Sequence, residues 1–304
     1  MGVAEFAVLL MAYGTPNSME DIEPYLTDIR RGRKPSPEAV QELKNRYNKI
    51  GGRSPLLEIT KAQASALEKK LVENGYDAHV YFGMKHWHPY IRETFPQIVN
   101  DGVGKVIGLA LAPHYSEMSV GGYRRALDEA NAGRLQIDFV ESWYDNHLFH
   151  VAVAEKIREA LRRFSRPDDV ELLFTAHSLP ERILQQNDPY ANQLQNSCRS
   201  VAAILNRERW SFAYQSAGMT QEGWLGPDLV EYLGRPNLRG LEGVLAVPIG
   251  FVADHLEILY DIDVEAQELA RSYGLHLERT QSLNATPAFI AALAYIVQKR
   301  IGQS

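Results

Sequence analysis

The chain has 304 residues, one cysteine, and 32 Lys and Arg against 38 Asp and Glu, giving a formal net charge of −6. Its length has room for two domains, and the lone Cys198 excludes an internal disulfide, a four-cysteine zinc site and a cluster held by four cysteines. The mild acidity argues against non-specific nucleic-acid binding, and no apolar run reaches the roughly 18 residues that span a bilayer. We therefore expect a cytoplasmic protein with no nucleic-acid partner and no integral membrane contact.

Apolar runs of strand length alternate with longer amphipathic stretches, which is typical of a parallel α/β fold. The expected strands are, in chain order, 6–12, 79–82, 106–112, 135–140, 172–176, 211–215, 243–248 and 275–278. Helical periodicity predicts helices over 36–50, 60–74, 149–164, 189–206 and 287–301. Pro37 and Pro287 would then occupy a first helical turn, which tolerates proline.

The two halves of the chain share short sequence matches. Residues 9–16 parallel 173–180, and 111–114 resemble 246–249. In each match an apolar strand ends in a small residue, followed by a polar or aromatic residue, with a proline close behind. Four strands per half therefore predict two similar doubly wound lobes, 1–145 and 146–285, with a final helix at 286–304 that packs back on the first lobe.

Ligands of open α/β sheets bind beyond the carboxyl ends of the strands. A shared cleft between the two lobes is therefore expected to be lined by the residues that follow the predicted strands. These residues are Tyr13, Lys85, His86, His114, Tyr115, His177, Ser216 and the segment after Pro248.

An acidic row follows the strand that ends near Pro248. If this segment is helical, Glu257, Asp261 and Glu265 stand at i, i+4 and i+8, on one face. Like charges at that spacing destabilise a helix by a few tenths of a kcal/mol per pair. The row is either a solvated helix face or a ladder that conducts protons or a divalent cation, since carboxylate oxygens bind Fe²⁺ or Mg²⁺.

His177 lies just beyond an apolar strand, at the expected rim of the cleft. A neutral imidazole there could accept protons near pH 7 or bind a metal, and a structural histidine bonded to backbone is the alternative. The sequence has no HExxH motif, which argues against a tightly held zinc, and neither GxxxxGK[ST] nor GxGxxG, which excludes the commonest nucleotide sites.

A basic segment near the start contrasts with the acidic whole. Residues 30–34 contain Arg30, Arg31 and two further cations, and Arg46 and Arg53 follow. Arginine forks suit carboxylates and phosphates because two parallel N–H groups match two oxygens. The alternative is a solvated basic loop.

Taken together, these motifs resemble the ferrochelatase family, whose members insert Fe²⁺ into a porphyrin in haem biosynthesis. The resemblance runs along nearly the whole chain, in family order. It is carried by residues 10–16, 29–35, 50–56, 83–86, 111–116, 141–145, 176–180, 224–228 and 250–257.

The resemblance implies a chelatase-like fold of two Rossmann-like lobes, each a four-stranded parallel sheet flanked by helices, with a porphyrin cleft between them. It also implies that His177 and Glu257 are the catalytic pair, with metal contacts from both of them and from Tyr13, Asp261 and Glu265. The acidic helix of the family is often widened by a π-turn, so the i+4 geometry is expected to be approximate.

Tyr13 bears on the substrate. With a tyrosine at this position, the chain resembles the soluble, monomeric enzymes of Gram-positive bacteria, which metallate coproporphyrin III. Four propionates would explain the basic segment, and the polar stretch 17–34 fits a water-soluble substrate. The implied substrate-binding residues are Tyr13, Arg30, Arg31, Arg46, Ser54, Lys85, His86, Tyr123 and Trp224.

Three alternatives stay open. They are a protoporphyrin IX ferrochelatase, a related chelatase for another tetrapyrrole and metal, such as sirohydrochlorin with cobalt or nickel, and a non-catalytic tetrapyrrole carrier. In each of the enzymatic cases the metal is a substrate.

The resemblance has one departure and several further implications. The family's Gly-Asp-Pro-Tyr motif begins here with Asn187, which tolerates the left-handed conformation that a turn needs. We expect no tightly bound cofactor and no iron–sulfur cluster, with Fe²⁺ and the porphyrin as substrates. A transient iron donor and a downstream haem-pathway enzyme are the expected partners of a cytoplasmic monomer.

Overall fold

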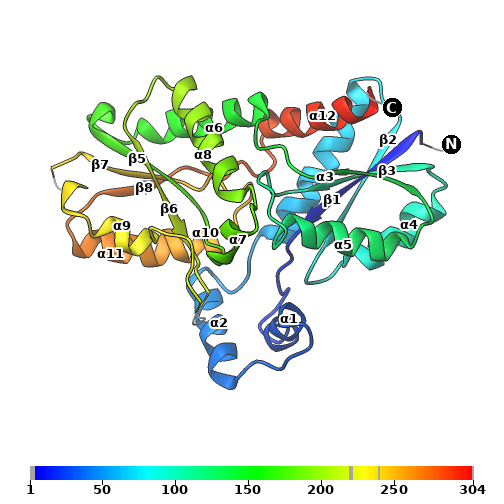
Figure 1. The fold of residues 1–304 in the computed structure, drawn as a ribbon, viewed down its shortest axis with the longest axis horizontal. Coiled ribbons are helices and arrows are strands. Elements are labelled where there is room, and N and C mark those ends of the chain that lie inside the picture. The colour runs from blue at the N-terminus through cyan, green and yellow to red at the C-terminus, as the bar shows by residue number, and fades with distance from the viewer. Residues whose placement is uncertain (1–3, 219–221, 239, 303–304) are drawn as a thin grey trace.

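The structure is a computed structural model that describes residues 4–218, 222–238 and 240–302. Two four-stranded parallel sheets lie side by side (Figure 1). The first sheet has the order β2-β1-β3-β4 and the second β6-β5-β7-β8, so the same topology occurs twice. The predicted α/β fold with two parallel four-stranded sheets is therefore confirmed.

The strands are close to the predicted positions. In the first sheet they are β1 (Phe6–Ala12), β2 (Ala78–Met84), β3 (Lys105–Ala110) and β4 (Gln136–Val140). In the second they are β5 (Val170–His177), β6 (Trp210–Gln215), β7 (Gly243–Val247) and β8 (Leu277–Arg279). All seven residues of β1 are buried, because helices cover both faces of a parallel sheet and its central strands are continuous apolar runs.

Helices cover both sheets. Those that precede β5 are α1 (Ile22–Ile29), α2 (Pro37–Lys49), α3 (Leu56–Glu73), α4 (Ile91–Asn100), α5 (Val120–Asn131) and α6 (His147–Leu161). Those that follow are α7 (Arg182–Gln185), α8 (Tyr190–Ile204), α9 (Leu229–Leu233), α10 (Leu256–Leu259), α11 (Gln267–Ser272) and α12 (Pro287–Ile301). Short 3₁₀ turns occur at Pro167–Asp169 and Pro236–Leu238, and a π-helix spans Asp261–Ala266. None of the helices within the described ranges is long and apolar enough to cross a membrane.

Local signals mark several helix starts. Ser36 accepts a hydrogen bond from the Ala39 amide at 3.3 Å ahead of Pro37, and Asn146 accepts one from the Phe149 amide at 3.0 Å. These side chains satisfy amide groups that the first helical turn leaves unpaired.

Several helices escaped the sequence analysis, among them α1, α4 and α5. In α1, which has eight residues, a proline stands at the third position, and α4 contains Pro96. In α5 two glycines follow Val120, and glycine is a poor helix former. Tertiary packing overrides these weak propensities, since Ile98 of α4 and Leu127 of α5 are both fully buried in the same apolar cluster.

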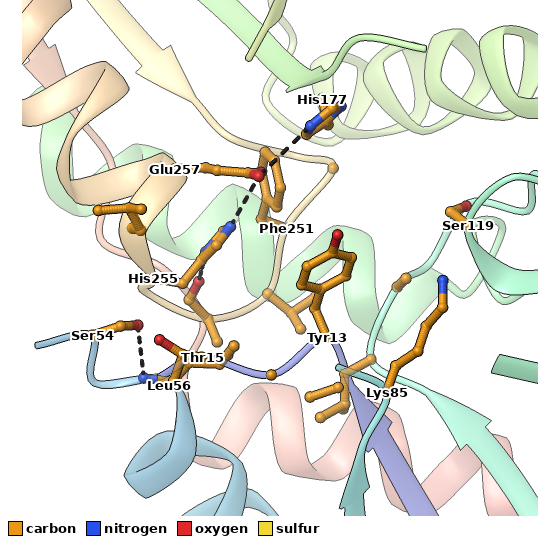
Figure 2. Close-up of a pocket in the computed structure, with 18 of the residues that line it drawn as sticks. Tyr13, Thr15, Ser54, Leu56, Lys85, Ser119, His177, Phe251, His255 and Glu257 are labelled. Atoms are coloured by element: carbon orange, nitrogen blue, oxygen red, sulfur yellow. Dashed lines mark hydrogen bonds and ion pairs between the residues drawn. The ribbon is translucent and has the colours of Figure 1, made fainter. Parts of the chain in front are cut away.

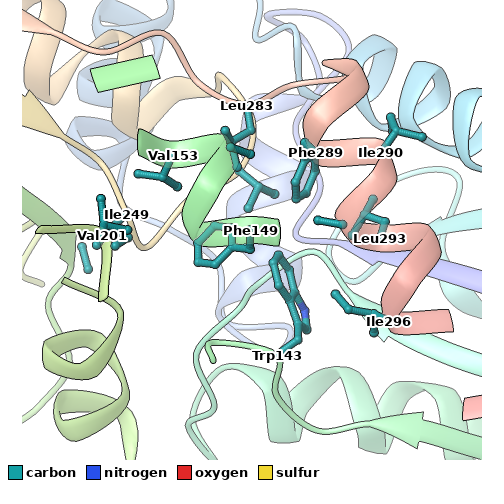
Figure 3. Close-up of a cluster of buried hydrophobic side chains, with 14 of the residues drawn as sticks. Trp143, Phe149, Val153, Val201, Ile249, Leu283, Phe289, Ile290, Leu293 and Ile296 are labelled. Carbon is teal, nitrogen blue, oxygen red and sulfur yellow. The ribbon is translucent and has the colours of Figure 1, made fainter. Parts of the chain in front are cut away.

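One apolar core runs through both lobes. It contains Leu10 of the first sheet and Leu245 of the second, and α12 packs against both α3 and α6. Figure 3 shows the centre of this core, where the Trp143 ring lies 5.2 Å from Phe149 and 6.1 Å from Phe289 between ring centroids. The lobe boundary predicted at residues 145 and 146 falls between β4 and α6 and stays a prediction.

Helices α1 and α2 stand apart from the sheets, below them in Figure 1. The α2 helix reaches across to the second lobe, where Lys49 lies 3.4 Å from Glu268 of α11. The Arg46 guanidinium also lies 5.0 Å from the centre of the Tyr260 ring. The first lobe therefore contacts the second on two sides, through the shared core and through α2.

Phe149→Ala tests the shared core. The Phe149 side chain is fully buried where the lobes meet, so its truncation is expected to cost about 3–5 kcal/mol of the free energy of unfolding. Urea unfolding followed by circular dichroism measures this loss. Leu148→Ala is the matched control, because Leu148 is 36% exposed on the same helix. Equal stabilities of the two variants would contradict a core that joins the lobes.

Candidate active site

A cleft with a cavity volume of about 320 Å³ lies between the carboxyl ends of the two sheets. Its walls come from both lobes, as Figure 2 shows for Tyr13 and Lys85 on one side and His177 and Glu257 on the other. Its polar lining residues are Tyr13, Thr15, Tyr25, Tyr47, Ser54, Lys85, His114, Ser119, Tyr123, His177, Tyr190, His255 and Glu257. A cleft at the strand ends, shared by two lobes, is the expected ligand site of such sheets.

Two histidines flank one carboxylate in this cleft. The Nε2 atom of His177 lies 3.6 Å from Oε1 of Glu257, and the Nε2 atom of His255 lies 3.6 Å from Oε2 (Figure 2). The ring nitrogen Nδ1 of His177 is hydrogen-bonded to the carbonyl of Ser178. With Nδ1 donating to that carbonyl, a proton taken up at Nε2 is held between the imidazole and the carboxylate.

The electrostatics favour an ionised Glu257. Burial alone raises its pKa, but His177, His255 and Arg46 outweigh that effect and lower the pKa to about 2. The converse holds for His255, where burial lowers the pKa and the Glu257 carboxylate raises it above the ordinary value. Glu257 is therefore a fixed negative charge at neutral pH, and both imidazoles face it.

Residues at the carboxyl end of β6 form hydrogen bonds to Glu257 and Asp261. Gln215 donates from its side-chain Nε2 to the backbone carbonyl of Glu257 at 2.9 Å. The backbone carbonyl of Gln215 accepts a hydrogen bond from the Ser178 amide at 2.8 Å. Ser216 follows with a left-handed φ of 58° and donates from Oγ to Asp261. A non-glycine residue in this conformation is held there by its surroundings.

Asp261 differs from Glu257 in its titration. It is buried at the start of the π-helix, 3.8 Å from Arg46. Burial and the Glu257 charge raise its pKa to about 6, although Ser216 and Arg46 act in the opposite direction. Asp261 can therefore exchange a proton near neutral pH, which Glu257 cannot.

The predicted α-helical row of acids is wrong in its geometry. The α10 helix ends at Leu259, and the amide of Glu265 bonds the Tyr260 carbonyl five residues earlier, as in a π-turn. Because the wider turn shifts the side chains, Glu265 is exposed and lies outside the cavity lining. Asp261 also lies outside the lining, so Glu257 is the one acid of the row that faces the cavity. The widened helix itself was expected.

The opposite wall carries aromatic and cationic groups. Tyr13 follows β1, is 41% exposed, and points its hydroxyl toward the space in front of Glu257 (Figure 2). The Lys85 Nζ atom lies 5.8 Å from the Tyr13 ring centre and 5.3 Å from that of Tyr123. His86 accompanies them, with its ring 4.7 Å from that of Tyr13 and Nδ1 2.9 Å from Oδ2 of Asp28.

This wall is positively polarised. Burial lowers the pKa of Lys85 to about 8, and the charges of Arg125 and Arg31 lower it further in the same direction. Burial also raises the pKa of the Tyr13 hydroxyl, helped by the charge of Glu257. This wall of the cleft thus presents a protonated phenol and a lysine whose positive charge an incoming anion would stabilise.

The cavity brings together six of the predicted site residues: Tyr13, Ser54, Lys85, Tyr123, His177 and Glu257. The others lie outside its lining: Arg30, Arg31, Arg46, His86, Trp224, Asp261 and Glu265. Arg30 and Arg31 are exposed just beyond α1, whereas Arg46 is engaged by Glu42 at 2.9 Å and by Asp261. Trp224 pairs with Pro180 in an antiparallel bridge three residues after His177. No group of three His, Cys, Asp or Glu side chains in the described ranges is close enough to hold a metal ion.

Several residues of the site were missed. His255 lies in the motif at residues 250–257, in which the resemblance gives a role to Glu257 but none to this histidine. Gln215 is the last residue of a predicted strand. Tyr47 and Thr15 share a hydrogen bond of 2.8 Å inside the lining, and nothing in the sequence pairs residues 32 positions apart. Strand ends were the usable signal, and they point to Gln215 as well as to Ser216.

The Asn-Asp-Pro-Tyr motif holds His177 and the two lobes together. Asn187 has a left-handed φ of 53°, as expected from the sequence. Asp188 accepts hydrogen bonds at 2.9 Å from the Ser116 hydroxyl and the Glu117 amide of the first lobe. Tyr190 donates its hydroxyl to the His177 carbonyl at 2.9 Å. The motif is therefore a link between the cleft wall and the other lobe.

Asp261→Asn tests the raised pKa of Asp261. A carboxylate whose folded pKa exceeds its unfolded pKa destabilises the fold at pH values above both, and this penalty disappears as the pH falls. We expect the variant to be about 1–3 kcal/mol more stable than the wild type at pH 7.5, with a gain that shrinks toward pH 4. Urea unfolding at both pH values measures it.

Glu268→Gln is the control for this measurement, because Glu268 is an exposed acid that pairs with Lys49. Its stability is expected to stay within about 0.5 kcal/mol of the wild type. An Asp261→Asn protein that is no more stable than the wild type at pH 7.5 would contradict a raised pKa of the buried Asp261 carboxyl.

Comparison with known proteins places the chain. The sequence profile of the Ferrochelatase family matches residues 5–301. A ferrochelatase from Herpetosiphon aurantiacus is 46% identical over 97% of this chain and 98% of that protein. A coproporphyrin III ferrochelatase from Bacillus subtilis is 42% identical over the full length of both. The solved sirohydrochlorin chelatase SirB from Bacillus subtilis shares the fold, with a TM-score of 0.57 at 10% identity, covering 97% of this chain and 95% of that one. The chain belongs to the ferrochelatase family.

Proposed function

We propose that this protein inserts Fe²⁺ into coproporphyrin III and yields coprohaem in haem biosynthesis. The observation that carries the proposal is the His177–Glu257 pair, 3.6 Å apart, which faces Tyr13 across a cleft between the lobes. Relatives named coproporphyrin III ferrochelatase, such as that of Bacillus pumilus at 43% identity over 99% of this chain, support the choice of porphyrin.

Metal insertion replaces two pyrrole N–H bonds by iron–nitrogen bonds and releases two protons. His177 accepts a pyrrole proton at Nε2, and the ionised Glu257 stabilises the imidazolium that forms. Because the pKa of Glu257 is lowered to about 2, it acts as a charge partner more than as a proton store. Asp261, with a pKa near 6, suits the onward transfer of protons to solvent.

Tyr13 acts from the other face of the macrocycle. Burial raises the pKa of its hydroxyl, so in the free protein the phenol stays protonated and offers a neutral oxygen toward the metal. A cleft whose opposite walls hold a macrocycle in a bent shape exposes the nitrogen lone pairs, which favours the transition state over the flat substrate. Metal contacts from Asp261 and Glu265 remain part of the proposal as the route toward the ring.

The rim of the cleft suits several carboxylates. Lys85 lies in the lining, and the exposed Arg31 is near enough for its charge to lower the pKa of Lys85. Arg30 precedes Arg31 in the chain and is also exposed. Coproporphyrin III carries four propionates, which such cations bind. Ser54, Tyr123, His86 and Trp224 are proposed as further contacts, and Arg46 as one that first gives up its bonds to Glu42 and Asp261.

We also propose that the protein is a cytoplasmic monomer without a tightly bound cofactor. A lone cysteine, buried in α8, supports the absence of an iron–sulfur cluster. A transient iron donor and a downstream haem-pathway enzyme are the proposed partners, since Fe²⁺ must be supplied and coprohaem taken over.

An anaerobic insertion assay with Fe²⁺ tests the proposed reaction. We expect a higher kcat/KM with coproporphyrin III than with protoporphyrin IX, and a loss of turnover of about 100-fold or more in His177→Ala, with porphyrin binding retained in fluorescence titrations. A preference for protoporphyrin IX would overturn the substrate. Cobalt insertion into sirohydrochlorin, or porphyrin retention without turnover, would favour another chelatase or a carrier.

The pH dependence of KM tests the role of Lys85. Because its pKa is near 8, its positive charge is present at pH 7 and is lost by pH 9. We expect KM for coproporphyrin III to rise about fivefold over this interval, as for a charge contact of about 1 kcal/mol. Lys85→Arg keeps the charge and should flatten the rise, whereas Lys85→Met should have a high KM throughout. An unchanged KM in Lys85→Met would exclude a propionate contact.

A further inference from the structure

A partly buried ion-pair network lies behind the catalytic carboxylate. Its centre is Arg279, the last residue of β8, whose side chain is 13% exposed. The guanidinium donates to both oxygens of Asp263 at 2.7 Å, and its NH1 group donates to Oδ1 of Asp254 at 3.2 Å. One side chain therefore joins two carboxylates that lie nine positions apart in the chain.

Those two carboxylates bracket the functional segment. Asp254 directly precedes His255, and Asp263 lies inside the π-helix that begins at Asp261. Glu257 lies between them. The guanidinium thus closes a loop of backbone that carries His255, which is one of the two histidines that flank Glu257, together with the catalytic glutamate and the titratable aspartate.

Asp254 is also fixed from a second side. Its Oδ1 atom accepts the Ser282 hydroxyl at 2.7 Å, and Oδ2 accepts from the Asn284 side-chain amide at 2.8 Å. Asn284 returns the contact, since its side-chain carbonyl accepts the Asp254 amide at 2.9 Å. Asn284 finally accepts from Gln63 of α3 at 2.9 Å, so the chain of bonds extends into the first lobe.

None of these residues belongs to the lining of the cavity: Gln63, Asp254, Asp263, Arg279, Ser282 and Asn284 all lie outside it. They form no part of its wall. Their effect on the cleft passes through the backbone between Asp254 and Asp263. A bidentate guanidinium–carboxylate pair fixes direction as well as distance, and a π-turn is a rare helical geometry that occurs often at functional sites.

We propose that Arg279 is a positioning residue for the reaction described above. By holding Asp254 and Asp263 together, it sets the place of Glu257 opposite His177 and keeps the π-turn that places Asp261 beside Ser216. The inference rests on the proposed metallation activity, but the arrangement of the segment can be measured without it.

The first test compares Arg279→Gln with the wild type in the anaerobic metallation assay. A shift of about 1 Å in a catalytic group costs up to about 100-fold in rate, so we expect kcat to fall about tenfold or more. KM for the porphyrin should stay within about twofold, because no substrate contact is removed. Arg279→Lys keeps the charge but lacks the planar fork, and an intermediate kcat is expected.

Arg163→Gln is the matched control. Arg163 pairs with Glu278 at 2.9 Å and donates to the backbone carbonyl of Arg279 at 2.6 Å, but within the described residues it forms no ion pair with Asp254 or Asp263, so its loss should leave kcat unchanged. Asp263→Asn is the second variant, since Asp263 is 36% exposed and its substitution is mild. It is expected to lower kcat in the same direction, and it decides the question alone if Arg279→Gln does not fold.

Backbone hydrogen exchange provides a readout besides activity. In Arg279→Gln we expect faster exchange confined to residues 254–266, with the remainder of the second lobe unchanged. Wild-type kcat in both variants, or faster exchange throughout the lobe, would overturn the positioning role. If the wild type metallates no porphyrin, the proposed function fails, while the exchange pattern still decides the role of Arg279.

Discussion

The two walls of the candidate active site come from different sheets. The distance between these walls therefore depends on the apolar contact that holds the two sheets together. Tyr13 follows β1 and His177 ends β5, and no covalent neighbour links them. Their separation is fixed by the core around Phe149 and by α12, which packs on helices of both lobes. A single continuous core resists hinge motion, since packed interiors deform little. Asp188 adds a polar link at the rim of the cleft.

Within that frame the chemistry is arranged by charge. Glu257 remains ionised because positive neighbours outweigh its burial, and Asp261 keeps its proton to a higher pH because burial and Glu257 oppose its charge. In the proposed reaction, these neighbouring acids with different pKa values divide the work of charge stabilisation and proton transfer. Lys85 and Tyr13 on the other wall complete a cleft that is negative on one side and cationic on the other.

Much of the fold could be predicted from the sequence, because buried parallel strands are continuous apolar runs and the repeat gives their number. The helix α5 could not, since its two glycines weaken a pattern that only packing against the sheet restores. Strand ends also led to Tyr13, Lys85, His114 and His177 in the cleft lining, whereas Tyr115 and Ser216, which were expected on the same ground, lie outside it. The sequence could not show contacts between distant positions, such as that of Arg279 with Asp254. It also could not show that Arg46 pairs with Asp261, so that its guanidinium is already engaged.

The repeat has a consequence for the groups that the two faces of a bound ring would meet. Aligning 9–16 with 173–180 puts Tyr13 and His177 at the same position of the two halves, just where equivalent central strands of identically ordered sheets run out. A flat ring bound between two identical halves would meet the same group above and below. Under the proposed function, the difference between Tyr13 and His177 gives the ring a basic side and a phenolic side. On that proposal, the proton-accepting imidazole lies on one face of the macrocycle and the phenol oxygen on the other.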